Sequence, residues 1–382
     1  MLRLYRNENE LLGKIIPSLT TKPKVWIQIT VPNEFQAVGE YNIGVTAGIE
    51  TTLCDAGWMQ GVNRMNLVIT SAEHGKLVFT NTKYDQKDPQ GKDVGKVELE
   101  KPIEVLFEGV RTDVYKPVNT DNNSTIVKTI NEIPEQFCFL TVGHWLQGDF
   151  GQDRKNMGGT IEMFLRTFKN KKTKPALLIK TQQANSSVSD QTTILTKIDE
   201  VRKKVGGGNL PNIYLLHGDL QDSEINAMYS HPKVKAMISL TRGEGFGRPL
   251  LEFAAHKKPI IASAWSGHTD FLRPDLTLLV GGKLEPVHPS AVIDKMILKD
   301  SKWFEFNPED ATKGLKLVYK DYKKLLTNAK KQTALINKNF SFESMQTKLD
   351  SILTQYVPDF PREVKFKMPG IKKIALPKMK TI

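Results

Sequence analysis

The segment from Thr241 to Glu252 has the residue types and the spacing of a ligand-binding corner. It follows an apolar run that predicts a strand, it holds three glycines within five positions, and Glu244 and Glu252 are separated by seven residues. Glycine lets the backbone turn sharply and approach a ligand closely. Pro249 suits the first turn of a helix, and the free N–H groups at a helix start attract phosphate. Because a carboxylate can accept hydrogen bonds from sugar hydroxyls, the pattern favours a site for a phosphorylated sugar.

The same segment resembles a known family. Glu244 to Glu252 is similar to the Glu-x7-Glu motif of retaining glycosyltransferases with the GT-B fold, of the "glycosyl transferases group 1" (family four) type. The resemblance is good over residues 137–280 and looser over residues 25–120. It includes a strand with a Ser-Gly turn, a "VG…RKN" loop and a strand ending in lysine, at Pro259–Leu272, Val142–Asn156 and Leu178–Thr181.

The resemblance implies a donor site for a nucleotide sugar, most simply a UDP-sugar. Lys155 and Lys180 are expected to hold its diphosphate and, with Glu244, to form the catalytic set. Fixed cations beside a departing diphosphate stabilise the charge that develops as the glycosidic bond breaks. Glu252 is expected to bind the ribose hydroxyls. The remaining expected donor-binding residues are Arg154, Gly243, Gly245, Phe246, Gly247, Leu220 and His144.

In such retaining enzymes the departing phosphate takes the acceptor proton on the same face of the sugar. The resemblance therefore implies no metal site and no cofactor besides the donor. Three acceptor or cleft candidates lie in the first domain, namely Glu50, His74 and Gly39. Glu50 could equally satisfy backbone donors in a buried turn, and a lone histidine such as His74 is more often structural.

The order of predicted elements explains how these residues could meet. Short apolar runs alternate with amphipathic helical stretches, which predicts an α/β protein with mostly parallel strands. We expect the GT-B arrangement, in which two Rossmann-like doubly wound domains face a cleft and ligands bind at the carboxyl ends of the strands. The strands are expected at 25–29, 66–70, 103–107, 137–143, 176–179, 213–216, 236–240 and 259–262.

These elements divide the chain into five parts. Residues 1–120 are expected to form a shortened acceptor-side domain, and the polar stretch within 121–136 predicts a linker. Residues 137–338 are expected to form the donor domain. A helix over 339–356, which begins after the potential N-cap Ser341, is expected to return towards the first domain, and 357–382 is a basic tail.

Composition limits the classes of protein that the sequence can specify. The 382 residues carry 54 Lys plus Arg against 42 Asp plus Glu, a net charge of +12, of which the tail supplies +5. The sequence contains no apolar run long enough for a membrane span and no apolar segment typical of a secretory signal, so we expect a cytoplasmic protein without stable membrane insertion. Two cysteines exclude a disulfide framework and a zinc cluster.

The acceptor is less determined than the donor. The positive charge favours double-stranded DNA, with transfer to a hydroxymethylated base as some phage glycosyltransferases perform it. Such a base would have to leave the helical stack to reach the donor. A second hypothesis is transfer to an envelope or capsular glycan or to a lipid-linked precursor. A third is an inactive module that binds nucleotide sugar or nucleic acid. The oligomeric state is left open.

Overall fold

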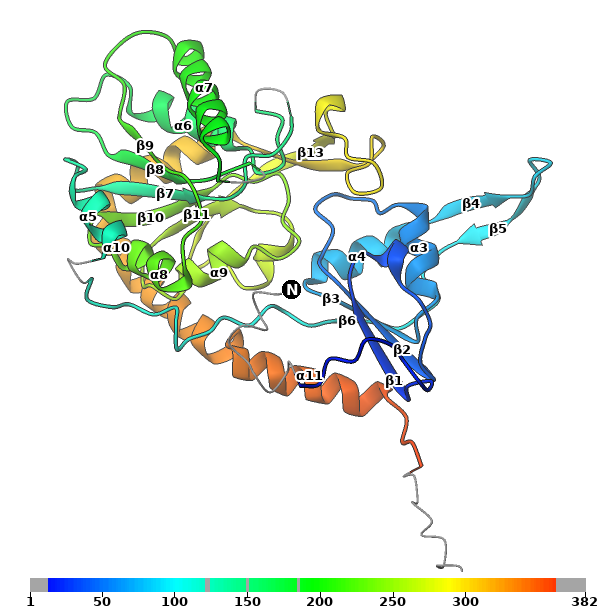
Figure 1. Ribbon diagram of the computed structural model, residues 1–382. Coiled ribbons are helices and arrows are strands. Elements are labelled where there is room, and N and C mark those ends of the chain that lie inside the picture. Colours follow the sequence, from blue (N-terminus) through cyan, green and yellow to red (C-terminus); the bar gives the residue numbers. More distant parts are fainter. Residues whose placement is uncertain (1–12, 121–123, 149–150, 184–185, 362–382) are drawn as a thin grey trace, which may run out of the picture.

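The computed structural model describes residues 13–120, 124–148, 151–183 and 186–361. Two parallel sheets form the centres of two α/β domains (Figure 1). The first sheet has the order β1-β2-β3-β6. Its strands are β1 (Val25–Ile29), β2 (Tyr41–Thr46), β3 (Leu67–Thr70) and β6 (Ile103–Val105). The sequence predicted three of these four strands. It missed β2, in which Asn42 and Gly44 lower the intrinsic strand preference.

Helices cover both faces of the first sheet. On one face, α3 (Ala56–Asn63) and α4 (Glu73–Asn81) bury Met59 and Phe79 against Val68. On the other face, α11 (Phe342–Tyr356) contributes Ile352, which packs against Ile43. Because successive residues of a strand point to opposite faces, the apolar strands of this sheet fill two separate cores.

The second sheet is larger and has the order β12-β11-β10-β7-β8-β9, with every pairing parallel. Its strands are β7 (Cys138–Val142), β8 (Ala176–Lys180), β9 (Ile213–Leu216), β10 (Val234–Ser239), β11 (Ile260–Ser263) and β12 (Leu278–Val280). One face is covered by α6 (Met157–Phe168), α7 (Val188–Val205) and α10 (Pro308–Asn339). The opposite face is covered by α5 (Thr125–Asn131), α8 (Asp222–Ser230) and α9 (Arg248–Ala254).

The predicted linker at 121–136 requires a correction. Residues 125–131 form α5, whose Ile126, Val127 and Ile130 are buried in the core beneath the second sheet. Burial of these three apolar side chains offsets the low helix preference of the polar residues that precede them. The helix is therefore part of the donor-side domain. Residues 121–123 lie outside the described part of the chain.

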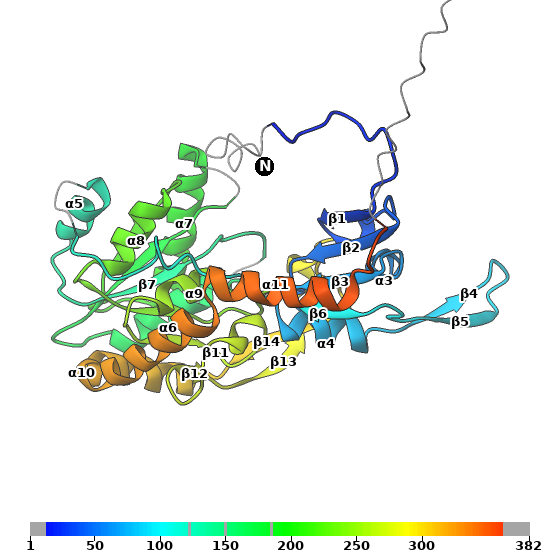
Figure 2. The same ribbon diagram turned by 90° about the horizontal axis from the view of Figure 1, so that it is seen from below.

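The chain crosses between the domains twice. Val110, after β6, donates its N–H to Phe340 O at 2.8 Å and accepts from Phe342 N at 3.0 Å. This pairing holds the outgoing crossover beside the point where α10 ends and α11 begins. From there α11 runs along the first sheet, as both views show (Figures 1 and 2).

Two antiparallel hairpins extend the domains beyond the predicted elements. β4 (Tyr84–Lys87) and β5 (Asp93–Val97) project from the first domain (Figure 1). β13 (Gly282–Pro286) and β14 (Lys302–Phe306) follow the edge strand β12. Short 3₁₀ helices lie at Pro32–Glu34, Gly267–Asp270 and Pro289–Ala291. Among the described residues, no helix combines the length and apolarity that crossing a membrane requires.

Candidate functional site

A cluster of buried charges lies between the domains at the carboxyl ends of the strands. Lys155 Nζ donates to both carboxylate oxygens of Glu244, at 2.6 and 2.7 Å. The two side chains are 12% and 7% exposed, so the ion pair is largely removed from water. Arg154 Nη1 lies 3.7 Å from Glu244 and 3.6 Å from Glu50 of the first domain. The cluster therefore joins two cations of the second domain to a carboxylate from each domain.

Hydrogen bonds to backbone groups fix the loops that carry this cluster. The loop after β10 is tied to the loop after β11, because Glu244 N donates to Ser266 Oγ at 2.9 Å and Gly267 N donates to Glu244 O at 3.0 Å. The loop after β7 is held in turn, since Arg154 Nη1 donates to Gly243 O at 3.0 Å. Three loops from neighbouring strands thus position the Glu244 carboxylate.

Lys180 reaches the same edge of the sheet from β8. It is in register with Val142 of β7, and Gly143 N donates to Lys180 O at 3.1 Å. The aliphatic stem of Lys155 lies over Gly143, where a Cβ would be 3.4 Å from Lys155 Cδ. Lys180 Nζ itself donates to Gly218 O. The two predicted phosphate-binding lysines therefore come from adjacent strand ends, although their side chains have different partners in this structure.

The glycine-rich corner is shaped by close contact with the first domain. A Cβ on Gly243 would stand 1.9 Å from the carbonyl oxygen of Glu50, which no side chain permits. Gly247 has a φ of 98° and precedes α9 as its N-cap, a conformation that favours glycine. A Cβ on Gly245 would be 3.1 Å from Gly48 O. Between them, the Phe246 side chain points into the core and contacts Phe271, so only its backbone lines the corner.

Glu252 lies one turn into α9 and is 6% exposed. Arg248 Nε donates to its Oε1 at 2.8 Å. Burial raises the pKa of Glu252 to about 7, and the charge of Arg248 opposes that rise. With this pKa, the carboxyl group is partly ionised near neutral pH. The ionised form has the acceptor oxygens that ribose hydroxyls require.

The charges around Glu244 give it a different behaviour. Burial alone would raise its pKa, but the charges of Lys155 and Arg154 outweigh burial and lower it to about 2. Burial lowers the pKa of Lys155, and Glu244 opposes this change. Glu244 is therefore ionised at neutral pH, and a bound diphosphate would compete with it for the two cations.

The three candidates of the first domain differ in position. Glu50 is adjacent to Arg154, as described above. His74 lies in the first turn of α4, with its ring 4.6 Å from that of Trp265 across the domain boundary. Burial lowers the pKa of His74 to about 4, so the ring is neutral at pH 7. Gly39 precedes β2 at the amino end of the sheet and contacts Trp26, whereas the cluster is at the carboxyl end. Gly39 is therefore not part of the site.

The two remaining donor candidates lie beside β8 and β9. His144 is exposed, and its Nδ1 is 3.1 Å from Gln183 O. Leu220 follows β9 and packs partly buried against the core cluster that includes α8 and α9. Both residues lie at the same edge of the sheet as the charged cluster. His144 lines a narrow cavity together with Arg154 and Lys155, whereas Leu220 packs on the core.

Sequence reasoning missed one acidic residue that faces the site. Glu108 follows β6, and its carboxyl group is close enough to Arg248 and Glu244 to feel both charges. Burial raises its pKa, Arg248 lowers it and Glu244 raises it. Its position directly after a parallel strand was the signal that could have identified it.

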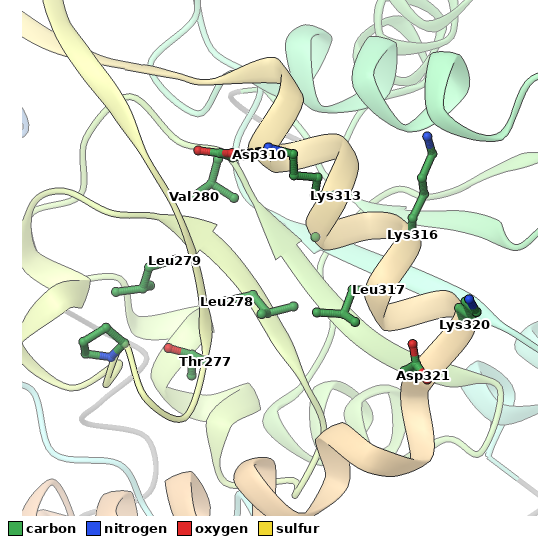
Figure 3. A pocket seen from close by; sticks show the side chains of 12 residues that line it. Thr277, Leu278, Leu279, Val280, Asp310, Lys313, Lys316, Leu317, Lys320 and Asp321 are labelled. Atoms are coloured by element: carbon green, nitrogen blue, oxygen red, sulfur yellow. Dashed lines mark hydrogen bonds and ion pairs between the residues drawn. The ribbon is translucent and has the colours of Figure 1, made fainter.

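Within the described residues, no group of three or more His, Cys, Asp or Glu side chains could hold a metal ion. A groove of about 680 Å³ lies between β12 and α10, where Leu278 and Leu317 are flanked by Lys313, Lys316 and Lys320 (Figure 3). No predicted site residue lines this groove. A narrower cavity is lined by His144, Arg154 and Lys155 together with Ile293 and Ile297, which lie between β13 and β14.

Comparison with solved structures identifies the fold. Sucrose-phosphate synthase from Thermosynechococcus elongatus superposes with a TM-score of 0.57 at 13% identity, over 87% of this chain and 73% of that one. A glycosyltransferase from Rickettsia africae gives 0.56 at 16% identity, over 84% and 71%. Anabaena HepE in complex with UDP-glucose gives 0.53 at 13% identity, over 82% and 72%.

These similarities confirm the predicted GT-B arrangement of two Rossmann-like domains. No protein-family model matches the sequence, and no curated protein matches it either. At identities of 13–16% the solved structures establish the fold alone. What this chain binds must therefore be argued from its own site.

Proposed function

We propose that this protein is a retaining glycosyltransferase that moves a sugar from a nucleotide-sugar donor, most simply a UDP-sugar, to a hydroxyl acceptor. The buried cluster of Lys155, Arg154 and Glu244 carries this proposal, because it gathers two cations at the strand ends beside a glycine corner. Ligands of doubly wound folds bind at this edge. The UDP-glucose complex of Anabaena HepE, which has a similar fold, supports the choice of donor.

The proposed reaction breaks the bond between the anomeric carbon and the β-phosphate oxygen. The acceptor oxygen forms the new bond to the anomeric carbon on the same face, and its proton passes to the departing phosphate. Lys155, Lys180 and Arg154 would stabilise the charge of the diphosphate as it leaves. Glu244 would face the transferred sugar, and Glu252 would hold the ribose hydroxyls.

Calorimetry with UDP-glucose and other nucleotide sugars tests the donor site. We expect Lys180→Ala to weaken donor binding at least tenfold, because it removes a cation from the diphosphate end. We expect Glu244→Gln to slow transfer at least tenfold in a separate activity assay, because it removes the carboxylate proposed to face the transferred sugar. Glu162→Gln is the matched control, since Glu162 is also an ion-paired glutamate but pairs with Arg166 and Lys204 on the outer helices. The proposal is wrong if no nucleotide sugar binds, or if all three variants behave as the native protein does.

For the acceptor, we propose a hydroxymethylated base in double-stranded DNA, which would place the reaction in the cytoplasm, of the host if the protein is phage-encoded. The net charge of +12 supports a polyanionic partner. Duplex DNA containing hydroxymethylpyrimidine should accept labelled sugar, and the same duplex with unmodified bases should not. Labelling of an envelope glycan or of a lipid-linked precursor, with none of DNA, would favour that class of acceptor instead.

A further inference from the structure

Arg248 has a position that helix stability does not explain. It is the first residue of α9, where the N-terminal end of the helix disfavours a cation. Its guanidinium reaches one turn further along the helix, where Nε donates to Glu252 Oε1 at 2.8 Å. The Arg248 side chain is 60% exposed, whereas that of Glu252 is only 8% exposed. An accessible cation thus covers a nearly buried carboxylate.

The other groups around Glu252 do not replace this cation. Tyr115 and Tyr229 are 3% and 1% exposed, and both phenols are near enough to hydrogen bond with the carboxylate. The third neighbour, Asp222, is acidic and accepts from the Tyr115 hydroxyl at 3.2 Å. Glu108 faces Arg248 from the crossover between the domains. Arg248 is therefore the cation that forms a hydrogen bond directly with Glu252.

We propose that Arg248 is a positioning residue that keeps the Glu252 carboxylate ionised and correctly oriented for the ribose of the donor. This inference rests on the proposed function, because it assumes that Glu252 binds the donor. Arg248 donates to Oε1 through Nε, and because an ionised carboxylate has about four acceptor positions, it can also accept hydrogen bonds from ribose hydroxyls. Without Arg248, burial and the charge of Asp222 would favour the neutral acid, which binds hydroxyls through fewer acceptor sites.

The inference predicts a specific change in the pH dependence of donor binding. In the native protein the affinity for UDP-glucose should rise with pH through about 7, the pKa of Glu252, while the diphosphate of this ligand stays ionised. Arg248→Met should move the midpoint upward by at least one pH unit and weaken binding about tenfold at pH 6.5. At pH 9 or above, the affinity of this variant should recover towards the native value. Arg248→Lys should move the midpoint upward by less than Arg248→Met does.

Calorimetric titration of UDP-glucose from pH 5.5 to 9.5 provides the measurement, with Arg166→Met as the matched control. Arg166 Nε pairs with Glu162 Oε1 at 2.9 Å, also four residues apart on one helix, and it is outside the site. A thermal unfolding scan of each variant confirms that it is folded at every pH used.

A double-mutant comparison separates this inference from the proposed function. If Arg248 acts through Glu252, Arg248→Met should have no further effect on affinity in a Glu252→Gln protein. Equal losses in both backgrounds, or a loss that does not recover at high pH, would mean that Arg248 contacts the donor directly and would overturn the inference. A Glu252→Gln protein that binds UDP-glucose as tightly as the native protein would instead overturn the proposed donor site.

Discussion

Burying the Lys155 ammonium or the Glu244 carboxylate costs free energy of solvation, and the attraction between the two charges offsets that cost. With side chains 12% and 7% exposed, neither can be solvated well by water. Arg154 adds a second positive charge at 3.7 Å from the carboxylate. If the proposed diphosphate binds here, the buried glutamate would keep the two cations in place while the ligand is absent and would occupy their hydrogen bonds.

Removing the lysine should reveal this dependence in the free energy of unfolding. We expect Lys155→Met to lower it at pH 7 by about 3–5 kcal/mol, because Glu244 remains buried beside a weaker set of cations. The pKa of Glu244 is lowered from 4.5 to about 2, so the stabilisation by its charge is complete above pH 5 and is lost as pH falls towards 2. The difference in the free energy of unfolding between Lys155→Met and the native protein should therefore become smaller as the pH falls from 5 to 3.

Urea unfolding at pH 7 and at pH 4 measures this effect. Lys83→Met is the control, because Lys83 pairs with Glu98 at 2.6 Å while both side chains are about half exposed. An exposed pair is strongly screened by water, so its loss should change the free energy of unfolding little at either pH. An unchanged stability of Lys155→Met at pH 7 would contradict the dependence described here.

At the scale of elements, two loops from different sheets determine the shape of the site. The connection from β10 to α9 carries Gly243 and Gly245, and the connection from β2 to α3 carries Gly48 and Glu50. A Cβ on Gly48 would be 2.5 Å from Gly245 O, so the two backbones meet where Gly48 cannot carry a side chain. Ser71 Oγ adds a hydrogen bond to Gly245 O at 3.4 Å. The glycine corner is thus as much an interdomain contact as a ligand loop.

This close contact predicts a sharp effect of a single methyl group. Gly243→Ala would place a Cβ 1.9 Å from Glu50 O, so the two loops must separate and carry Glu244 and Arg154 with them. We expect donor affinity to fall at least tenfold and the melting temperature to fall as well. Gly207→Ala is the matched control, because a Cβ there meets nothing within 4 Å. Thermal unfolding and calorimetry compare the two, and equal behaviour would contradict the role assigned to this contact.

At the scale of the whole molecule, the crossover and α11 connect two domains that each contribute to the site. The Glu73 N–H at the start of α4 donates to Asp270 Oδ2 of the second domain at 2.8 Å. Thr52 N donates to Lys302 O at 3.0 Å, so β14 also contacts the first domain. These bonds keep Glu50 beside Arg154 in this structure. The net charge of +12 acts on the same scale, since it belongs to no single element.

The proposed DNA acceptor makes a prediction about salt. The affinity for duplex DNA should fall steeply as salt rises from 50 to 200 mM, with a logarithmic slope of about −0.9 for each phosphate contacted. Deleting residues 362–382, which lie outside the described part of the chain, should flatten that slope. It removes one acidic residue, Glu363, and seven basic residues, Arg362, Lys365, Lys367, Lys372, Lys373, Lys378 and Lys380. Fluorescence anisotropy measures both proteins. A flat response of the full chain would count against DNA as the acceptor.

The sequence by itself determined the α/β class and five of the six strands of the larger sheet, all except β12. Runs such as 176–179 and 213–216 are short, apolar and separated by helical patterns, so local composition is sufficient to identify them. The resemblance to a glycosyltransferase motif singled out Glu244, Glu252, Lys155 and Lys180, and loops that follow parallel strands lie along one edge of a sheet. The strand predictions depend only on neighbours in the chain, whereas the site predictions depended on that resemblance.

Only the tertiary structure decided which of these residues meet. Glu50 and Arg154 are 104 positions apart, and nothing local in either segment predicts their 3.6 Å approach. The structure likewise excluded Gly39, assigned α5 to the donor-side domain and brought Glu108 towards Arg248. Each of these facts depends on packing between segments far apart in the chain, and packing is a property of whole surfaces that no short stretch of sequence contains.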